Sequence, residues 1–375
     1  MSRRVAAVVV GAAAVLFVAL HWSDAYQWKP DSLFYEAQLL RVQGAEKDAA
    51  LLKVFHGPLA RPRVQEELRT TPPARRTVAS DRWVRYSERF YDRRWTVPVL
   101  AAAVEPALGA DALRGISLLG YVLAGLAIQA FLGLRFRPWI GAVTALGCLA
   151  LQPLRYWSLL PLTDSFGVAL EAAALACAVC ALRRSWPWLV VLAGVMLALS
   201  FTRDSTIVVV AGLAWVAVRL RSRRAMTTLG VAVAASLPAP LLFGAPALDL
   251  VAYTLNGFQP VQGSKWHLIA RRYLSGEHGL VHGDLIYLAH HPYVGLFAAG
   301  GLVGLFALRA GGDVAGALAR GGVAGAVVLL LAAPNYTALR LELPFVPLAA
   351  YGAALAVAAG WASRPAAGPA RASRS

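Results

Sequence analysis

Apolar segments that lack any charged side chain recur along the chain, as at residues 5–20, 189–201 and 323–339. A helix of about 18–20 apolar residues spans the roughly 30 Å hydrocarbon core of a bilayer. We therefore expect an all-α polytopic membrane protein that forms a single integral membrane domain over residues 1–375. The pattern predicts about ten transmembrane helices, at residues 5–22, 112–134, 138–154, 164–182, 187–202, 205–219, 226–246, 293–308, 321–338 and 343–361.

Two long polar stretches interrupt this pattern, and both are predicted to be extracytoplasmic loops. The first, 23–94, contains apolar side chains at helical spacing and then an aromatic, cationic segment. We expect interfacial helices there at residues 31–43, 45–55 and 81–94, with a proline-rich linker at 56–80. The second stretch, 247–292, is glycine-rich towards its end and is predicted to be a large loop. The apolar piece 95–108, which contains Pro98 and Glu105, is expected to be re-entrant or to lie on the membrane face.

The distribution of charge predicts the orientation of the chain in a cell membrane. Only 15% of the residues are charged, against about 25% in soluble domains, and the net charge is +16. The short connections on one side of the predicted helices are basic, whereas nearly all carboxylates fall on the other side. Because short cytoplasmic loops are enriched in basic residues, both termini are predicted to be cytoplasmic. The segment 5–22 also resembles a signal peptide, but Trp22 after its apolar core suits a membrane-interface anchor better than a cleavage site.

The composition excludes several function classes. With 58% hydrophobic residues, a large water-soluble core is excluded as the main body. The basic residues lie mainly at the ends of apolar segments, which favours membrane lipids rather than nucleic acid as partners. No GxxxxGK[ST] motif is present, and the glycines at 300–304 and 321–325 have the spacing of helix-packing motifs instead. The cysteines Cys148, Cys177 and Cys180 lie in apolar segments and are expected to act as small hydrophobic residues.

Ionisable residues at the outer ends of the predicted helices are the candidate functional groups. A charged group near a bilayer is costly to desolvate and is therefore frequently functional. These residues belong to separate helix ends that a bundle brings together, although each one alone is also compatible with an interfacial salt bridge. They are Asp31, Glu36, Asp92, Arg93, Arg94, Asp164, Arg203, Asp204, His290, His291, Arg340 and Glu342.

Four short motifs in the chain resemble one family. The first polar stretch opens with Trp28-Lys-Pro-Asp31-Ser-Leu-Phe-Tyr35-Glu36 and is followed through Arg89-Phe-Tyr-Asp-Arg-Arg-Trp-Thr-Val-Pro98 into the next apolar segment. Leu162-Thr-Asp164-Ser opens a helix in mid-chain, and Arg340-Leu-Glu342-Leu-Pro344 precedes the last one. In these motifs and their layout the chain resembles the polyprenyl-phosphate-sugar-dependent glycosyltransferases of the GT-C superfamily, which include the protein O-mannosyltransferases and the lipid A aminoarabinose transferases. It differs from the family's frequent pair of adjacent acidic residues, since Ser32 follows Asp31.

The resemblance implies an inverting, hexosyltransferase-like transfer from a polyprenyl-phosphate-linked sugar donor to an acceptor hydroxyl on the extracytoplasmic face. Such a transfer needs a carboxylate to accept the hydroxyl proton and cations to hold the departing phosphate. We expect Asp31 to be the catalytic base and Arg340 and Arg203 to bind the phosphate through their rigid sets of donors. Tyr35 lies one helical turn after Asp31 and is expected to position substrate, with Glu36 a weaker candidate.

Other roles stay open for these residues. Asp31 is also in place to cap its helix, and Arg340 is in place to pair with Glu342. Asp164 and Glu342 are kept as substrate-binding candidates. Asp164 and Glu171 lie seven residues apart on one predicted helix face, so they fit a cavity wall, a proton path or helix packing.

Metal binding has no clear motif in this chain. Acidic residues and histidines cluster in the second polar stretch, at Glu277, His278, His282, Asp284, His290 and His291. Their spacing matches no standard zinc signature, and this stretch is expected to be a loop that contacts substrate or solvent. A divalent cation shared by Asp31 and the donor phosphate is neither required nor excluded, and no other cofactor is indicated. Asn335-Tyr-Thr337 fits a glycosylation sequon but adjoins a predicted span, which favours a chance match.

Two further function classes are alternatives to a glycosyltransferase. A polytopic lipid or solute transporter or flippase typically has internal repeats and polar sites near the membrane midplane. Glu171 is the one clear deep charge in favour of that class. A non-catalytic membrane protein of cell-envelope assembly is the third class. The concentration of polar residues on one side favours the glycosyltransferase interpretation.

Overall fold

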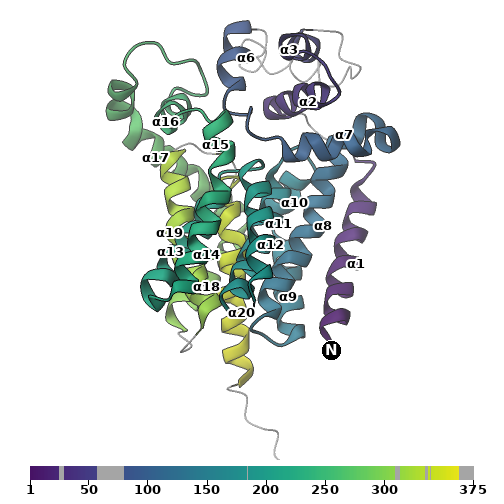
Figure 1. Ribbon diagram of the computed structural model, residues 1–375, viewed down its shortest axis with the longest axis vertical. Coiled ribbons are helices and arrows are strands. Elements are labelled where there is room, and N and C mark those ends of the chain that lie inside the picture. The colour runs from purple at the N-terminus through teal and green to yellow at the C-terminus, as the bar shows by residue number, and fades with distance from the viewer. Residues whose placement is uncertain are drawn as a thin grey trace, which may run out of the picture.

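The computed structural model describes residues 1–24, 29–56, 80–183, 185–308, 313–333, 337 and 339–362. Every regular element within these residues is a helix, which confirms the predicted all-α class. Long helices run side by side as a bundle, and shorter helices form a layer across one end of it (Figure 1). The elements are α1 (Arg3–His21), α2 (Pro30–Val42), α3 (Lys47–Phe55), α6 (Asp81–Glu88), α7 (Thr96–Leu108), the 3₁₀ helix η1 (Gly109–Asp111), α8 (Ala112–Gly133), α9 (Pro138–Leu149), α10 (Gln152–Ser158), α11 (Asp164–Arg183), α12 (Pro187–Ser200), α13 (Thr206–Leu220), α14 (Arg223–Ser236), α15 (Pro238–Phe243), α16 (Ala247–Leu255), α17 (Lys265–His290), α18 (Pro292–Ala307), α19 (Val314–Ala332), the 3₁₀ helix η2 (Leu343–Phe345) and α20 (Val346–Ala362).

Six helical segments of the described chain are long and apolar enough to cross a membrane, as expected for a membrane-embedded helical protein. They are α1, the segment Thr96–Gly133 of α7 and α8, α11, the segment Arg223–Phe243 of α14 and α15, α19, and the segment Leu343–Ala362 of η2 and α20. The helices α9, α12, α13 and α18 are apolar but shorter. Each predicted span contains one of these helices, and the number that cross the membrane stays a prediction.

The start of α19 follows from its capping residue. The span predicted at 321–338 begins earlier, at Val314, because the buried Asp313 carboxylate accepts a hydrogen bond from the Gly316 amide at 3.1 Å. The Tyr351 hydroxyl of α20 donates to the two oxygens of the same carboxylate at 2.7 and 2.6 Å. The cap of α19 therefore also ties this helix to α20.

Small residues fill the interior of the bundle and allow its helices to approach closely. A Cβ atom on Gly325 of α19 would lie 2.5 Å from the Ile207 carbonyl oxygen of α13, and one on Gly301 of α18 would meet the Ala349 carbonyl oxygen of α20. Such close contacts contribute much of the association of membrane helices, so the predicted packing role is confirmed for Gly301 and Gly325, whereas a Cβ on Gly300 would meet no atom within 4 Å. The three cysteines are buried in α9 and α11 and are free.

The helices α2, α3 and α6 lie together across one end of the bundle and share a small apolar core of their own (Figure 1). Phe34 of α2 packs against Phe55 of α3 and Trp83 of α6, with ring centroids 4.9 and 5.7 Å away. The observed bounds of α2 and α3 lie within two residues of the predicted helices. The apolar face of α2, expected to lie on the membrane, packs against the other helices of this layer.

The third helix of this layer is shorter than the helix predicted at 81–94. α6 ends at Glu88, and the chain then turns, with the amides of Tyr91 and Asp92 donating to the Glu88 carbonyl. The turn stacks the Tyr91 ring on Phe34, with the centroids 4.5 Å apart and the planes inclined by 6°. Residues after Glu88 are therefore directed into the protein instead of along its surface. The linker predicted at 56–80 lies outside the described residues apart from its two ends.

The glycine-rich part of 247–292 is a helix, so its predicted loop character is wrong. α17 runs for 26 residues through three glycines, although each glycine costs about 1 kcal/mol relative to alanine. The Ser264 hydroxyl caps the helix by accepting from the His267 amide at 3.3 Å, and the Tyr273 hydroxyl donates to the Leu331 carbonyl of α19 at 2.7 Å. Capping and contact with the bundle therefore override the local composition.

The two ends of the described chain lie at the same end of the bundle. Figure 1 shows α1 beginning and α20 ending opposite the layer of α2, α3 and α6, and it shows α7 lying crosswise over the end of α8. The Arg114 guanidinium of α8 donates to the His21 and Trp22 carbonyls at 2.8 and 2.6 Å, which stabilises the C-terminal end of α1. The side of the membrane on which the termini lie stays a prediction.

Candidate functional site

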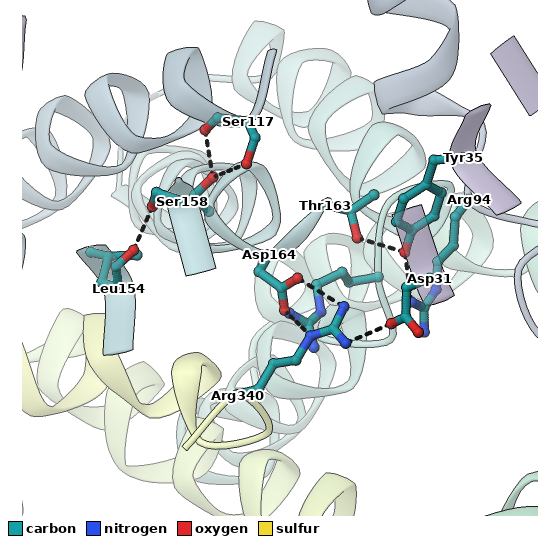
Figure 2. A network of polar contacts seen from close by, with 11 residues as sticks. Asp31, Tyr35, Arg94, Ser117, Leu154, Ser158, Thr163, Asp164 and Arg340 are labelled. Carbon is teal, nitrogen blue, oxygen red and sulfur yellow. Dashed lines mark hydrogen bonds and ion pairs between the residues drawn. The ribbon is translucent and has the colours of Figure 1, made fainter. Parts of the chain in front are cut away.

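Four of the predicted site residues meet where the bundle adjoins the layer of α2, α3 and α6. Asp31 is on α2 and Asp164 is the first residue of α11, whereas Arg203 lies between α12 and α13 and Arg340 lies just before η2. Figure 2 shows Asp31, Asp164 and Arg340 pointing toward one another. Asp31 and Arg340 are 309 residues apart in sequence, yet their side chains form a hydrogen bond. The structure brings these residues together, and the chemical role of each stays a prediction.

Arg340 is the central residue of this cluster. Its Nε and Nη2 atoms donate to the two carboxylate oxygens of Asp164 at 2.8 and 3.0 Å, and its Nη1 donates to Asp31 at 2.5 Å. The planar fork of a guanidinium fits a carboxylate in this two-point manner. The guanidinium also lies 5.1 Å from the centroid of the Trp157 ring. Since all three nitrogens bond to Asp31 and Asp164, the alternative pairing of Arg340 with Glu342 is wrong.

Asp31 is held by its neighbours and does not cap its helix. The N-cap of α2 is Lys29, which makes no side-chain capping hydrogen bond. The Asp31 carboxylate instead accepts from Arg340 and, at 2.7 Å, from the Tyr91 hydroxyl. Burial raises the pKa of Asp31, but the charge of Arg340 and the Tyr91 hydrogen bond outweigh it and hold that pKa below its ordinary value. Burial and the nearby Asp31 raise the pKa of Tyr91 well above its ordinary value, so the hydroxyl keeps its proton and donates.

Accessibility separates the two carboxylates of the cluster. The side chains of Asp31 and Arg340 keep 18% and 15% of their surface exposed, whereas Asp164 keeps none. A ligand that approaches from outside the bundle therefore meets Asp31 and Arg340 first. Asp164 is placed to orient arginine side chains, and this position does not favour the direct substrate contact expected for it.

Arg203 is the second arginine on Asp164, and a glycine makes room for it. Its Nη1 atom donates to the Asp164 carboxylate. Its side chain runs over Gly167, because a Cβ atom at that position would lie 2.6 Å from Arg203 Cδ and 3.1 Å from Cγ. Only glycine leaves this space free. Gly167, which sequence analysis does not single out, is therefore part of the geometry of the site.

Arg94, one of the candidate charged residues of the sequence to which no specific role was given, also reaches the cluster. Its Nη1 atom donates to the Tyr35 hydroxyl at 2.9 Å, and that hydroxyl lies 3.3 Å from the Thr163 hydroxyl (Figure 2). The Nε atom of Arg94 is buried without a hydrogen-bond partner among the described residues. Tyr35 is thus fixed beside the cluster by Arg94 and Thr163.

Together with the adjoining residues Arg93, Arg94 and Asp204, the cluster carries one more positive than negative charge. Arg93 pairs with Asp204 at the edge of the cluster. Burial raises the pKa of Asp204, but the charges of Arg93, Arg94 and Arg203 outweigh this effect and hold that pKa below its ordinary value. The four cations and three anions are Arg93, Arg94, Arg203, Arg340, Asp31, Asp164 and Asp204. Four positive minus three negative charges leave +1. An anion such as a phosphate group would neutralise this excess.

The remaining predicted acids lie outside this cluster. Glu342 lies beside Asp284 of α17, and burial together with Asp284 raises the pKa of Glu342 to about 8. Burial also raises the pKa of Asp284, so the two carboxyls hold at least one proton between them at neutral pH. Glu36 is half-buried on α2, outside the hydrogen bonds of Arg340. Glu171 is fully buried in α11, deeper in the bundle than Asp164.

The described residues include no group of three or more histidine, cysteine, aspartate or glutamate side chains that could hold a metal ion together. Asp31 and Asp164, the acids at the centre of the cluster, bond to guanidinium groups. The sequon at Asn335-Tyr-Thr337 lies outside the described residues apart from Thr337.

Comparison with known proteins adds no family to this geometry. No protein-family model matches the chain, and no curated protein matches it at a significant level. The functional interpretation therefore depends on the residues of the cluster and on the short motifs that contain them.

Proposed function

We propose that the chain is a membrane glycosyltransferase that transfers a sugar from a polyprenyl-phosphate donor to an acceptor hydroxyl on the extracytoplasmic face. The observation that carries the proposal is an accessible carboxylate, Asp31, held 2.5 Å from an accessible guanidinium, Arg340, at one end of an apolar helix bundle. A base beside a phosphate-binding cation is the pair of groups that such a transfer requires. Both residues belong to the motifs that resemble the GT-C superfamily.

The proposed reaction is a single displacement at the sugar. The acceptor oxygen attacks the anomeric carbon, and the bond from that carbon to the phosphate oxygen breaks. The electron pair leaves with the polyprenyl phosphate, while Asp31 accepts the proton of the attacking hydroxyl. Attack opposite the leaving group inverts the anomeric configuration. Atoms and charge balance without any further reactant.

Three arginines are the proposed ligands of the departing phosphate. Arg340 is slightly more exposed than Arg203, which lies beside it on Asp164, and Arg94 has a buried Nε atom with no described partner. Their excess charge over the carboxylates of the cluster supports an anionic ligand. Asp164 is proposed to orient Arg340 and Arg203, and Tyr35, fixed by Arg94, to position the donor sugar.

Donor binding is expected to strengthen the base. Without donor, Arg340 keeps the pKa of Asp31 below its ordinary value, which makes Asp31 a weak proton acceptor. A phosphate that accepts hydrogen bonds from Arg340 competes with Asp31 for them and neutralises the charge that lowers this pKa. The pKa of Asp31 then rises toward the value that burial alone favours. The base is therefore activated only when a leaving group is in place.

The proposal includes an orientation in a cell membrane. We infer a multi-pass protein of about ten spans, with both termini cytoplasmic and the cluster at the extracytoplasmic end. The basic short connections of the sequence support this orientation. The position of the termini at the end of the bundle opposite α2, α3 and α6 agrees with it (Figure 1).

Sugar transfer by the purified protein in lipid vesicles tests the proposal. The vesicles contain polyprenyl-phosphate donors labelled in the sugar, and candidate acceptors are supplied on either side. A transferase breaks the sugar–phosphate bond and releases polyprenyl phosphate, and Arg340→Gln should abolish this release. A flippase moves the labelled lipid between leaflets with the bond intact. Movement without cleavage would contradict the proposal and favour a transporter, for which the buried Glu171 is the supporting observation.

A further inference from the structure

A cavity lies at the end of the bundle where α20 ends, away from the carboxylate–arginine cluster. Its volume is about 630 Å³, within the range of small-molecule sites. It is formed by the turn between α8 and α9, by the last residues of α18 and by the last two turns of α20. Its larger side chains are Arg135, Arg137, Phe136, Ile140, Leu355 and Trp361. The cavity thus combines an apolar wall with two cations at one edge.

The two arginines are not paired with any described acid. No ion pair of the described residues involves Arg135 or Arg137. Tyr351 interacts with Arg135 and also donates a hydrogen bond to Asp313. The Asp313 carboxylate is already engaged by this hydroxyl and by the Gly316 amide. A cavity with two cations and an apolar wall is therefore complementary to a ligand that is anionic at one end and apolar at the other.

Two further features support an anionic lipid as the ligand. α9 begins at Pro138, directly after the two arginines, and has no side-chain cap, so its N-terminus adds partial positive charge at the same edge. The Trp139 and Trp361 rings meet nearby with centroids 4.9 Å apart. Tryptophan is enriched at the level of lipid headgroups, where apolar helices meet water. A phospholipid at that level presents its phosphate beside its acyl chains.

We propose that this cavity binds an anionic phospholipid, with the phosphate between Arg135 and Arg137 and an acyl chain along the wall of α18 and α20. The site depends on the membrane embedding of the bundle and not on the glycosyltransferase proposal. Basic pockets between membrane helices bind anionic headgroups in this way. The competing occupant is the chain's own segment 363–375, which follows Ala362 at the rim.

Native mass spectrometry of the full-length protein in neutral detergent measures this binding, with dioleoylphosphatidylglycerol as the probe and dioleoylphosphatidylcholine as the neutral reference. The wild type should bind the anionic lipid saturably and in preference to the neutral one. Arg135→Gln or Arg137→Gln should weaken binding about fivefold each, and the double variant about thirtyfold. The matched control Arg219→Gln/Arg223→Gln removes the same charge at the adjoining ends of α13 and α14, outside the cavity, and should leave binding unchanged. Equal losses in both double variants would overturn the proposal in favour of general surface attraction.

A second pair of variants tests the apolar wall without changing charge. Ala359→Trp fills the cavity from α20 and should prevent binding, whereas Val357→Trp lies outside the cavity on the same helix and should not. Deletion of residues 363–375 should leave the affinity as it is. If the anionic lipid binds only after this deletion, the chain's own segment is the occupant and the proposal is overturned.

Discussion

Replacing Gly167 by alanine should displace Arg203 from Asp164. A Cβ at position 167 would lie 2.6 Å from Arg203 Cδ, about 1 Å closer than the roughly 3.5–4.0 Å of ordinary carbon contacts. The helix α11 has little room to move away from Arg203, because it packs closely against α8. A Cβ on Gly120 of α8 would lie only 2.6 Å from the Phe166 amide nitrogen of α11. The side chain of Arg203 is therefore the part that moves, and its hydrogen bond to Asp164 is lost.

The expected cost of this substitution follows from two opposing terms. A hydrogen bond between charged groups contributes about 1.5–3 kcal/mol. Alanine in place of glycine within a helix stabilises it by about 1 kcal/mol. Gly167→Ala should therefore lower the free energy of unfolding by about 0.5–2 kcal/mol. The loss stays limited because Asp164 keeps both of its hydrogen bonds to Arg340.

Thermal unfolding in detergent measures the effect against a matched control. Gly194→Ala in α12 adds a Cβ that meets no atom within 4 Å, so it should be neutral or slightly stabilising. In an Arg203→Ala background the clash is absent, and Gly167→Ala should then also be neutral or stabilising. If Gly167→Ala behaves like the control, or if its effect simply adds to that of Arg203→Ala, then Arg203 does not lie over Gly167.

Three further predictions concern donor binding, pH dependence and orientation. Arg340→Lys should recover only part of the donor use that Arg340→Gln loses, because an ammonium cannot reproduce the two-point contact; equal transfer rates in Arg340→Lys and wild type would contradict this. The folded-state pKa of Glu342, about 8, lies above its unfolded value of about 4.3, so the stability present at low pH should fall as pH rises through about 8. Glu342→Gln should reduce that fall in unfolding temperature, and an unchanged slope in the variant would contradict the raised pKa of Glu342. Reporter fusions at Ser222 and Ala79 should report cytoplasmic and extracytoplasmic positions respectively, and signals from one side would refute the orientation.

The central residues of the site were predictable because of where their charges lie. Asp164 and Arg340 stand at the ends of apolar helices and Asp31 stands at the start of the amphipathic α2, where an ionisable side chain near a bilayer is costly unless it is paired or used. Gly167 carries a weaker signal, a glycine on a membrane helix within one turn of Asp164. Arg203, which follows α12, fills the space that Gly167 leaves. This contact depends on the tertiary structure, and the local sequence does not predict it.

Arg94 was a candidate only through its charge near a helix end, and neither its contact with Tyr35 nor the membership of Tyr91 in the site was predictable. Both residues lie in a run of alternating aromatic and charged residues whose spacing predicts a surface helix through position 94. The turn after Glu88 directs them inward instead, and it is stabilised by the Phe34–Tyr91 stack between distant parts of the chain. Local periodicity does not contain that contact.

The fold shows the same division between local pattern and tertiary contact. Hydrophobic segments located the long helices, because their length and apolar character are properties of each segment alone. The early start of α19 depends on the buried Asp313, and the continuity of α17 through its glycines depends on Ser264 and on contact with α19. The local composition predicts neither the early start of α19 nor the continuity of α17.

Sugar transfer by Asp31→Asn tests the central claim most directly. Asparagine keeps the shape of the side chain and one oxygen that can accept from Arg340, and its amide group can donate to the Tyr91 hydroxyl, but it has no site that takes up a proton at neutral pH. General-base catalysis typically contributes about 10²–10⁴-fold, so turnover from a polyprenyl-phosphate donor should fall on that scale while the protein accumulates in the membrane as the wild type does. Glu36→Gln, on the same helix but outside the hydrogen bonds of Arg340, should stay close to wild-type turnover. Near-normal transfer by a well-expressed Asp31→Asn protein would contradict the assignment of Asp31 as the base.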